Sequence, residues 1–225
     1  MKKIYRGIPT YYVSVDCIIF AYCEGKIQVL LQHRMIEPHI GELTLLGGFV
    51  EEEESLDDAA IRVLKERTGM TNVYLEQVET FGAIDRDPGG RVFSTAYFAL
   101  LNKAKHDEIH IEKYNCKWVD IDNLPVLYFD HLKMLQKALT ILQDKITYTP
   151  IALNLLPETF TLTQLQQVYE GLLGKQLDKR NFRKRVNDMP YFEKTDGVDK
   201  SMSKRGAAIY RFNTKKYKKM RGYHL

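Results

Sequence analysis

Six side chains between positions 179 and 187 could bind a polyanion. They are Lys179, Arg180, Asn181, Arg183, Lys184 and Asn187. Lysine and arginine contact phosphates, while arginine and asparagine also read the edges of guanine and adenine in the major groove. Phe182, Val186 and Met189 lie between them at the spacing of an apolar helix stripe. The pattern therefore predicts a helix over residues 179–189, capped by Asp178, whose polar face binds double-stranded DNA.

A second helix is predicted just before this one. Residues 160–169 open with threonines suited to an N-cap and continue with apolar residues at helical spacing. Gly171 or Gly174 could end this helix. The two helices together are typical of a helix-turn-helix.

A basic hairpin is predicted after the two helices. Residues 191–194 and 207–212 are typical of strands, and the loop between them is rich in polar and basic residues. A helix-turn-helix followed by such a hairpin is a winged helix. We expect Lys200, Lys204 and Arg205 of its loop to lie along the DNA.

The charge of the chain changes sign near position 146. Residues 1–146 hold 17 Lys and Arg against 22 Asp and Glu, whereas residues 147–225 hold 16 against 7. A basic domain of this kind indicates a polyanion partner, because neutralised phosphates release counterions. For single lysines near the C-terminus, a solvated charge is an equally good interpretation. The sequence therefore predicts two domains, 1–146 and 147–225.

The first domain is predicted to be mixed α/β. Short apolar segments typical of strands surround one strong helical pattern over residues 55–67, and a second helical stretch over 131–145 leads into the basic domain. No apolar run is long enough for a membrane span and the N-terminus lacks a signal-peptide core, so we expect a cytoplasmic protein. The three cysteines and the scattered histidines lack metal-site spacing, which favours structural roles.

Gly47 and Gly48 are expected to end a predicted strand over residues 43–46, and residues 47–70 contain a spaced set of glycines and charges. They are Gly48, Glu54, Arg62, Leu64, Glu66, Gly69 and Met70. Their spacing resembles the Nudix box, and residues 81–92 resemble a segment of Nudix-related transcriptional regulators and of their ADP-ribose hydrolase relatives. The resemblance implies an α/β (α+β) Nudix-like sandwich followed by a winged helix-turn-helix domain.

The Nudix box of this chain departs from that of active enzymes. Active members carry a glutamate directly after the arginine and two adjacent glutamates three residues later, and these hold magnesium. Here the positions are Val63, Glu66 and Arg67. The resemblance therefore implies a scaffold with no catalytic residues, no bound metal and no cofactor, in which Glu54 and Arg62 brace the loop to the helix. The glutamates of residues 51–53 remain alternative ligands.

A loop in the first domain could bind a small molecule. Asp85, Arg86, Asp87 and Arg91 flank Pro88 and two glycines, which suggests a loop shaped around a polar effector. Structural salt bridging explains these residues equally well. Within the regulators, the chain most resembles the arabinose-responsive branch, which implies L-arabinose or a related sugar as effector rather than ADP-ribose. The same resemblance implies a homodimer on a palindromic operator.

Three functions remain open from the sequence. The leading interpretation is a non-enzymatic repressor that a sugar releases from DNA. The second is an active Nudix pyrophosphohydrolase for an ADP-ribose-like substrate with a nucleic-acid-binding appendage, which requires magnesium-dependent turnover. The third is an RNA-binding module, which would prefer single-stranded RNA to duplex DNA.

Overall fold

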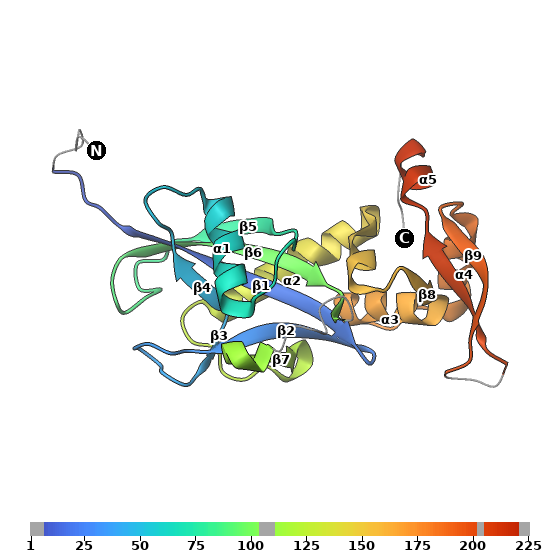
Figure 1. Cartoon of the computed structure of the whole chain (residues 1–225), viewed down its shortest axis with the longest axis horizontal. Coiled ribbons are helices and arrows are strands. Elements are labelled where there is room, and N and C mark those ends of the chain that lie inside the picture. Colours follow the sequence, from blue (N-terminus) through green and yellow to red (C-terminus); the bar gives the residue numbers. More distant parts are fainter. Residues whose placement is uncertain (1–6, 104–110, 202–204, 221–225) are drawn as a thin grey trace.

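The first part of the chain contains a large mixed sheet and the second part contains a small sheet (Figure 1). The computed structural model describes residues 7–103, 111–201 and 205–220. Within these residues the large sheet has seven strands in the order β3-β2-β1-β6-β5, with β4 paired to β1 and β7 paired to β2. The strands are β1 (Tyr12–Cys23), β2 (Lys26–His33), β3 (Leu43–Thr44), β4 (Leu46–Phe49), β5 (Glu76–Phe81), β6 (Val92–Leu101) and β7 (Cys116–Asp120).

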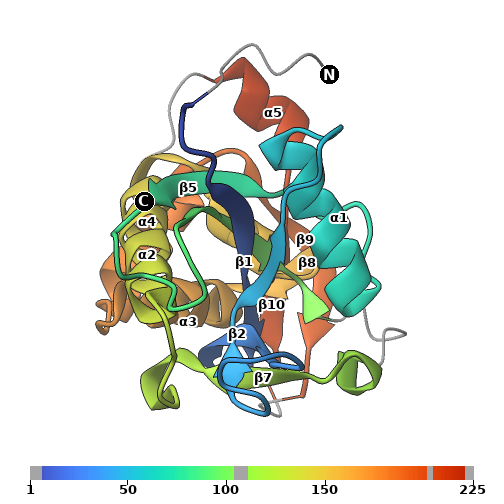
Figure 2. The ribbon, with the colours of Figure 1, turned by 90° about the vertical axis from the view of Figure 1, so that its left-hand side faces the viewer.

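Helices cover both faces of the large sheet. Ile18 and Phe20 of β1 belong to one apolar cluster with α2 (His131–Tyr148), and Val15 and Cys17 belong to another with α1 (Leu56–Thr68). Figure 2 shows α1 and α2 on opposite sides of β1. Because both faces are covered, the buried residues of β1 are apolar on either face, and Asp16 is the exception among them. The predicted mixed α/β class of this part is confirmed.

Glycines allow β4 to approach α1 closely. We expected Gly47 and Gly48 to end a strand, but both lie inside β4, where they pair with Asp16 and Val15 of β1. A Cβ atom on Gly48 would lie 2.6 Å from Cγ2 of Val63 in α1. Glycine is unfavourable in strands in general, and here the contact with the helix requires it.

The second part of the chain is a winged helix. A short 3₁₀ helix, η4 (Pro150–Leu155), leads from α2 to β8 (Thr159–Thr161), α3 (Leu162–Leu173) and α4 (Lys179–Asp188). The hairpin of β9 (Phe192–Asp199) and β10 (Ala207–Phe212) follows, and β8 pairs with β10 to complete a three-stranded sheet in the described residues. The chain continues into α5 (Thr214–Lys219). The predicted winged helix is confirmed, and β8 and α5 are elements that sequence reasoning missed. Two further short 3₁₀ segments in the described ranges are η2 (Ile111–Tyr114) and η3 (Ile121–Asn123).

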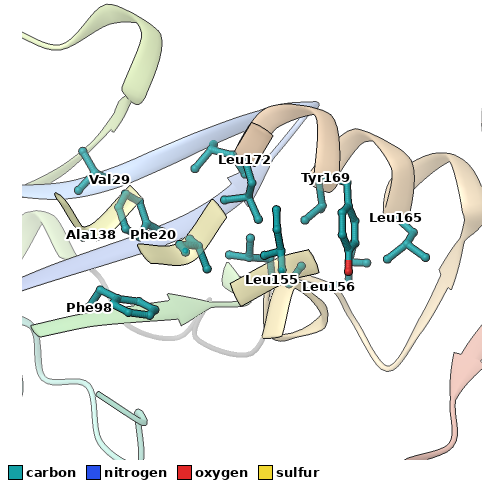
Figure 3. Close-up of a cluster of buried hydrophobic side chains, with 14 of the residues drawn as sticks. Phe20, Val29, Phe98, Ala138, Leu155, Leu156, Leu165, Tyr169 and Leu172 are labelled. Atoms are coloured by element: carbon teal, nitrogen blue, oxygen red, sulfur yellow. The ribbon is translucent and has the colours of Figure 1, made fainter. Parts of the chain in front are cut away.

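One apolar cluster connects the two parts. Phe20 and Val29 of the large sheet share it with Leu155 of η4 and with Tyr169 and Leu172 of α3 (Figure 3). A hydrogen bond of 2.9 Å from the Tyr22 hydroxyl to Oε1 of Gln167 lies at the edge of the same contact. The winged helix is therefore packed against the sheet through α3.

The proposed domain boundary after Ile146 falls near the end of α2, which continues to Tyr148. We keep this boundary as a proposal, with η4 as the segment that follows it. None of the helices in the described ranges has the length and apolar character needed to span a bilayer.

Candidate ligand-binding site and nucleic-acid interface

A cavity opens where β4, the segment after β2, the loop after β5 and the start of α2 meet. Its wall includes the backbone of Gly47 and Gly48 and the side chains of Arg34, Arg67 and Arg86. A second cavity lies next to it and shares Arg86 and Phe129 with the first. A ligand in either cavity would therefore contact the same arginine or its immediate surroundings.

A buried ion pair connects the loop after β5 to α2. Nε and Nη2 of Arg86 donate hydrogen bonds of 2.9 and 2.8 Å to the two carboxylate oxygens of Asp130, which is the N-cap residue of α2. Nη2 of Arg86 also lies 3.8 Å from Oδ2 of Asp16 on β1. Asp16 accepts a hydrogen bond of 2.5 Å from the hydroxyl of Ser94. Because these charges are buried, each depends on its partners for stability.

His131 completes this polar cluster in a neutral form. Its Nδ1 accepts the backbone N–H of Leu45 at 3.2 Å, so the proton resides on Nε2, which lies 3.6 Å from Oδ1 of Asp16. Burial lowers the pKa of His131, and the nearby Asp16 only partly offsets this effect. Sequence reasoning gave the histidines structural roles and had no signal for this contact, because Asp16 lies far away in the sequence.

The structure separates the four residues predicted to bind the effector. Asp87 lines the first cavity, Asp85 lines the second one, and Arg86 lines both. Arg91 lines neither of these two cavities; its Nη1 donates hydrogen bonds of 2.8 Å to the carbonyl oxygens of Gly82 and Ala83. Arg91 thus supports the base of the loop, while the other three remain proposed ligand contacts.

The brace expected from the Nudix-box resemblance is present. Nε of Arg62 donates a hydrogen bond of 2.9 Å to Oε2 of Glu54, and its Nη2 donates to Oε1 of the same carboxylate and to the carbonyl oxygen of Phe49. These bonds lower the pKa of Glu54 to about 2. Glu66 lies 3.2 Å from Nη1 of Arg62 and is held by the same side chain. The remaining carboxylates of the box therefore serve α1 and its loop.

The described residues do not fit the magnesium site of active Nudix enzymes. No group of three or more His, Cys, Asp or Glu in the described part of the chain is arranged to hold a metal ion. Val63 is 1% exposed and belongs to the apolar cluster around α1, while Arg67 lines the cavity. Glu51, Glu52 and Glu53 are exposed and belong to no such group. The structure therefore does not support these three glutamates as alternative magnesium ligands.

The polar face of α4 is available to a partner. Phe182 and Val186 are buried, and the ring of Phe182 lies 5.9 Å from that of Tyr169 in α3. On the other side five of the six predicted residues are exposed, namely Lys179, Arg180, Asn181, Lys184 and Asn187. Arg183 is half-buried, and its Nη2 donates to the hydroxyl of Thr163 at 3.4 Å. Arg185, which sequence reasoning left out, is also exposed.

Two of the three basic residues predicted to lie along the DNA are exposed at the hairpin. Lys200 and Arg205 are exposed at the hairpin loop, while Lys204 lies outside the described residues. Farther along, Lys216 binds Glu193 of β9 at 2.6 Å, and Arg211 binds the same carboxylate at 2.9 Å. These contacts and Asn213 lower the pKa of Glu193 to about 2. Lys216 is therefore paired with the hairpin although it is exposed, and Lys215 and Lys218 are exposed as well.

Comparison with known proteins identifies both parts of the chain. Residues 10–138 match the family model of the NUDIX domain, and residues 152–212 match the NrtR DNA-binding winged helix domain. The ADPR responsive transcriptional repressor NtrR of Acinetobacter baylyi is 39% identical over 214 residues, which cover 93% of this chain and 85% of that protein.

Solved structures agree with this comparison. Shewanella oneidensis NrtR complexed with a 27mer DNA superposes with a TM-score of 0.77 at 32% identity, covering 89% of this chain and 93% of that one. The NUDIX domain of the same Shewanella protein complexed with ADP ribose gives a TM-score of 0.52 at 28% identity, covering 61% of this chain and 92% of that one.

The fold and the sites define a Nudix-type domain without the metal-binding carboxylates, joined to a DNA-binding winged helix. This is the architecture of a Nudix-related transcriptional regulator, as the resemblance implied. The chain belongs to the NrtR family of these regulators.

Proposed function

We propose that this protein is a transcriptional repressor whose Nudix domain senses ADP-ribose and whose winged helix binds an operator. The observation that carries the proposal is a Nudix cavity lined by three arginines and lacking a cluster of metal-binding carboxylates within the described residues. Such a cavity favours binding of an anionic nucleotide over its hydrolysis.

ADP-ribose replaces L-arabinose as our proposed effector. The Acinetobacter relative is named for its response to ADPR, and the Shewanella NUDIX domain was crystallised with ADP ribose, whereas neither relative's name gives arabinose any support. The chemistry of the cavity agrees, because Arg34, Arg67 and Arg86 suit a diphosphate better than an uncharged pentose. The proposed effector therefore differs from the sugar that the resemblance to the arabinose-responsive branch implied.

Operator binding is proposed for the exposed face of α4 and for the hairpin. Lys179, Arg180 and Lys184 are exposed on this helix, and the Shewanella relative, which has the same architecture, was crystallised with a 27mer DNA. We further propose a homodimer on a palindromic site. Two recognition helices about 34 Å apart would contact successive major grooves on one side of the duplex.

The ion pair between Arg86 and Asp130 is our proposed link between the sites. A ligand that moves the loop carrying Arg86 also acts on Asp130 at the start of α2, and α2 leads through η4 to α3 of the winged helix. A tenfold to hundredfold change in operator affinity requires the ligand to favour one arrangement by about 1.4 to 2.8 kcal/mol. A few hydrogen bonds that differ between the two arrangements supply this energy.

The absence of hydrolase activity is also part of the proposal. Restoring Val63→Glu would bury a carboxylate beside Gly48 and the apolar cluster around α1, so a single reversion is unfavourable in this packing. We expect no magnesium-dependent release of AMP from ADP-ribose by the wild-type chain. Turnover at a rate typical of Nudix enzymes would restore the hydrolase interpretation.

The test is a titration of duplex DNA from the upstream region of the chain's own gene at fixed salt. We expect specific binding that ADP-ribose weakens at least tenfold and that L-arabinose leaves unchanged. A scrambled duplex of equal length is the control. Binding that responds to L-arabinose alone, or to neither ligand, would contradict the proposed effector, and preference for single-stranded RNA would favour the RNA-binding module.

A further inference from the structure

Arg67 presents an unsatisfied hydrogen-bond donor next to the cavity. Arg67 lines the cavity wall, and its Nε is buried without a hydrogen-bond partner in residues 7–103, 111–201 and 205–220. A buried donor without a partner destabilises the protein by its full desolvation penalty. Because Arg67 belongs to the cavity wall, a turn of its guanidinium towards the cavity would let a ligand supply the missing acceptor.

The other two arginines of the cavity already have partners. Arg86 is bound bidentately to Asp130. Nε and Nη2 of Arg34 donate to the carbonyl oxygens of Pro38 and Glu37 at 2.6 and 3.3 Å, and its guanidinium carbon lies 4.9 Å from the centre of the Phe129 ring. Among the three arginines of the cavity wall, Arg67 is thus the one whose N–H groups are most available to donate hydrogen bonds to a ligand.

Cys116, which contacts Arg67, supplies no counter charge for it. Sγ of Cys116 donates a hydrogen bond of 3.3 Å to the backbone oxygen of Arg67. The positive charge of Arg67 favours the thiolate, but burial dominates and raises the pKa of Cys116 to about 12. The thiol therefore stays neutral at physiological pH and is no counterion for the guanidinium.

The position of Arg67 in the Nudix box suggests the acceptor. In active relatives this position carries one of the glutamates that hold magnesium on the substrate's diphosphate, and in this chain the described residues contain no metal-binding cluster. A guanidinium can satisfy two phosphate oxygens at once through its planar fork of N–H groups. We infer that Arg67 replaces the metal ion here and binds the diphosphate of the ligand directly, so that ligand binding needs no divalent cation.

This inference rests on the proposed function, because it assumes that the cavity takes ADP-ribose. The test is calorimetric titration of the full-length chain with ADP-ribose, once with magnesium and once with excess EDTA. We expect equal affinity in the two buffers for the wild type. Arg67→Ala is expected to weaken binding at least tenfold in both, because a charge-assisted phosphate contact is lost, and Arg67→Lys is expected to recover part of the loss.

Lys65→Ala is the matched control. Lys65 is a second cation in the last turn of α1, but it is exposed and does not line the cavity. We expect this variant to bind ADP-ribose like the wild type, and we expect both alanine variants to retain operator affinity and similar melting temperatures. Those two readouts separate loss of a ligand contact from loss of the fold.

The outcomes separate the two proposals. If the wild type binds no ADP-ribose in either buffer, the proposed effector is wrong. If the wild type binds ADP-ribose only with magnesium, or if Arg67→Ala binds it with unchanged affinity, the effector stands and the role given to Arg67 is overturned. An equal loss of affinity in Lys65→Ala and Arg67→Ala would also overturn it, because the effect would then belong to the charge of α1.

Discussion

A cluster of buried polar residues lies next to the proposed ligand site, formed by Arg86, Asp130, Asp16 and His131. Arg86 is 7% exposed, Asp130 is 9% exposed, and each is satisfied mainly by the other. Replacing such a pair by apolar residues is often neutral for stability, so its presence suggests a role beyond stability. In this protein the pair joins the wall of the cavity to the first residue of α2.

The neutral state of His131 predicts a pH dependence of stability. Because burial lowers its pKa in the folded protein, the unfolded chain binds the proton more readily. The stability contributed by neutral His131 is therefore present above about pH 6.5, the ordinary histidine pKa, and is lost as the pH falls from there towards the lower folded pKa. Denaturant unfolding at a series of pH values measures this slope.

His131→Asn tests the assignment. An asparagine oxygen could still accept the N–H of Leu45 but cannot titrate, so we expect a flatter dependence of the unfolding free energy between about pH 6.5 and pH 5. His33→Asn is the control, because His33 is exposed. An unchanged slope in His131→Asn would assign the titration to other groups.

Among the elements, α4 combines a buried face with an exposed basic one. The side chain of Asp178 accepts the backbone N–H of Asn181 at 2.8 Å, which starts the helix directly before its basic residues. Its apolar residues hold it on α3, so the exposed side is presented rigidly. The half-buried Arg183, by contrast, contacts Thr163 of α3, which favours a bracing role over base recognition.

Arg180→Ala is expected to weaken operator binding by about 1 to 3 kcal/mol if Arg180 reads a base, and to relax preference at one operator position. If it contacts phosphate, the loss is expected to be similar for all sequences, and the salt slope falls by about one. Fluorescence anisotropy at several salt concentrations distinguishes the two. Lys26→Ala is the control, because Lys26 pairs with Asp120 on the large sheet, and an equal loss in both variants would argue against the chosen face.

At the scale of the whole molecule, the two parts are packed as one continuous apolar cluster and are not connected by a free linker. Ile27 of β2 lies so close to α3 that a Cβ on Gly171 would be 2.9 Å from its Cγ1. The hydrogen bond from Nε2 of Gln143 in α2 to the carbonyl oxygen of Leu172 adds a second contact. Packed interfaces of this kind move between discrete arrangements, which suits a repressor that responds to a ligand.

Asp130→Asn is expected to separate ligand binding from its effect on DNA. The change keeps the shape of the side chain but removes the charge that Arg86 binds. We therefore expect ADP-ribose still to bind the protein but to be less effective in releasing it from operator DNA. Operator titrations with and without ADP-ribose, beside calorimetry, measure both. Glu79→Gln is the control, because Glu79 pairs with Lys137 of α2 at the surface, and an unaltered release in Asp130→Asn would exclude this ion pair as the link.

Local patterns were enough to predict much of the fold. β10 occupies the predicted residues 207–212, and α3 ends at Gly174, one of the two glycines predicted to end it, in a left-handed conformation. These elements could be predicted because caps, glycine conformations and apolar periodicity act between residues a few positions apart.

The elements and the site that local patterns did not predict depend on long-range contacts. Gly47 and Gly48 were expected to end a strand but lie inside β4, because the contact of Gly48 with Val63 depends on the packing of α1. β8 is a three-residue strand that exists through its pairing with β10. The sequence alone determined the class of protein, two domains with a degenerate Nudix box and a basic winged helix. Only the tertiary structure brought Arg67, Arg86 and His131 to one cavity, because the contacts of such residues join segments that no local pattern relates.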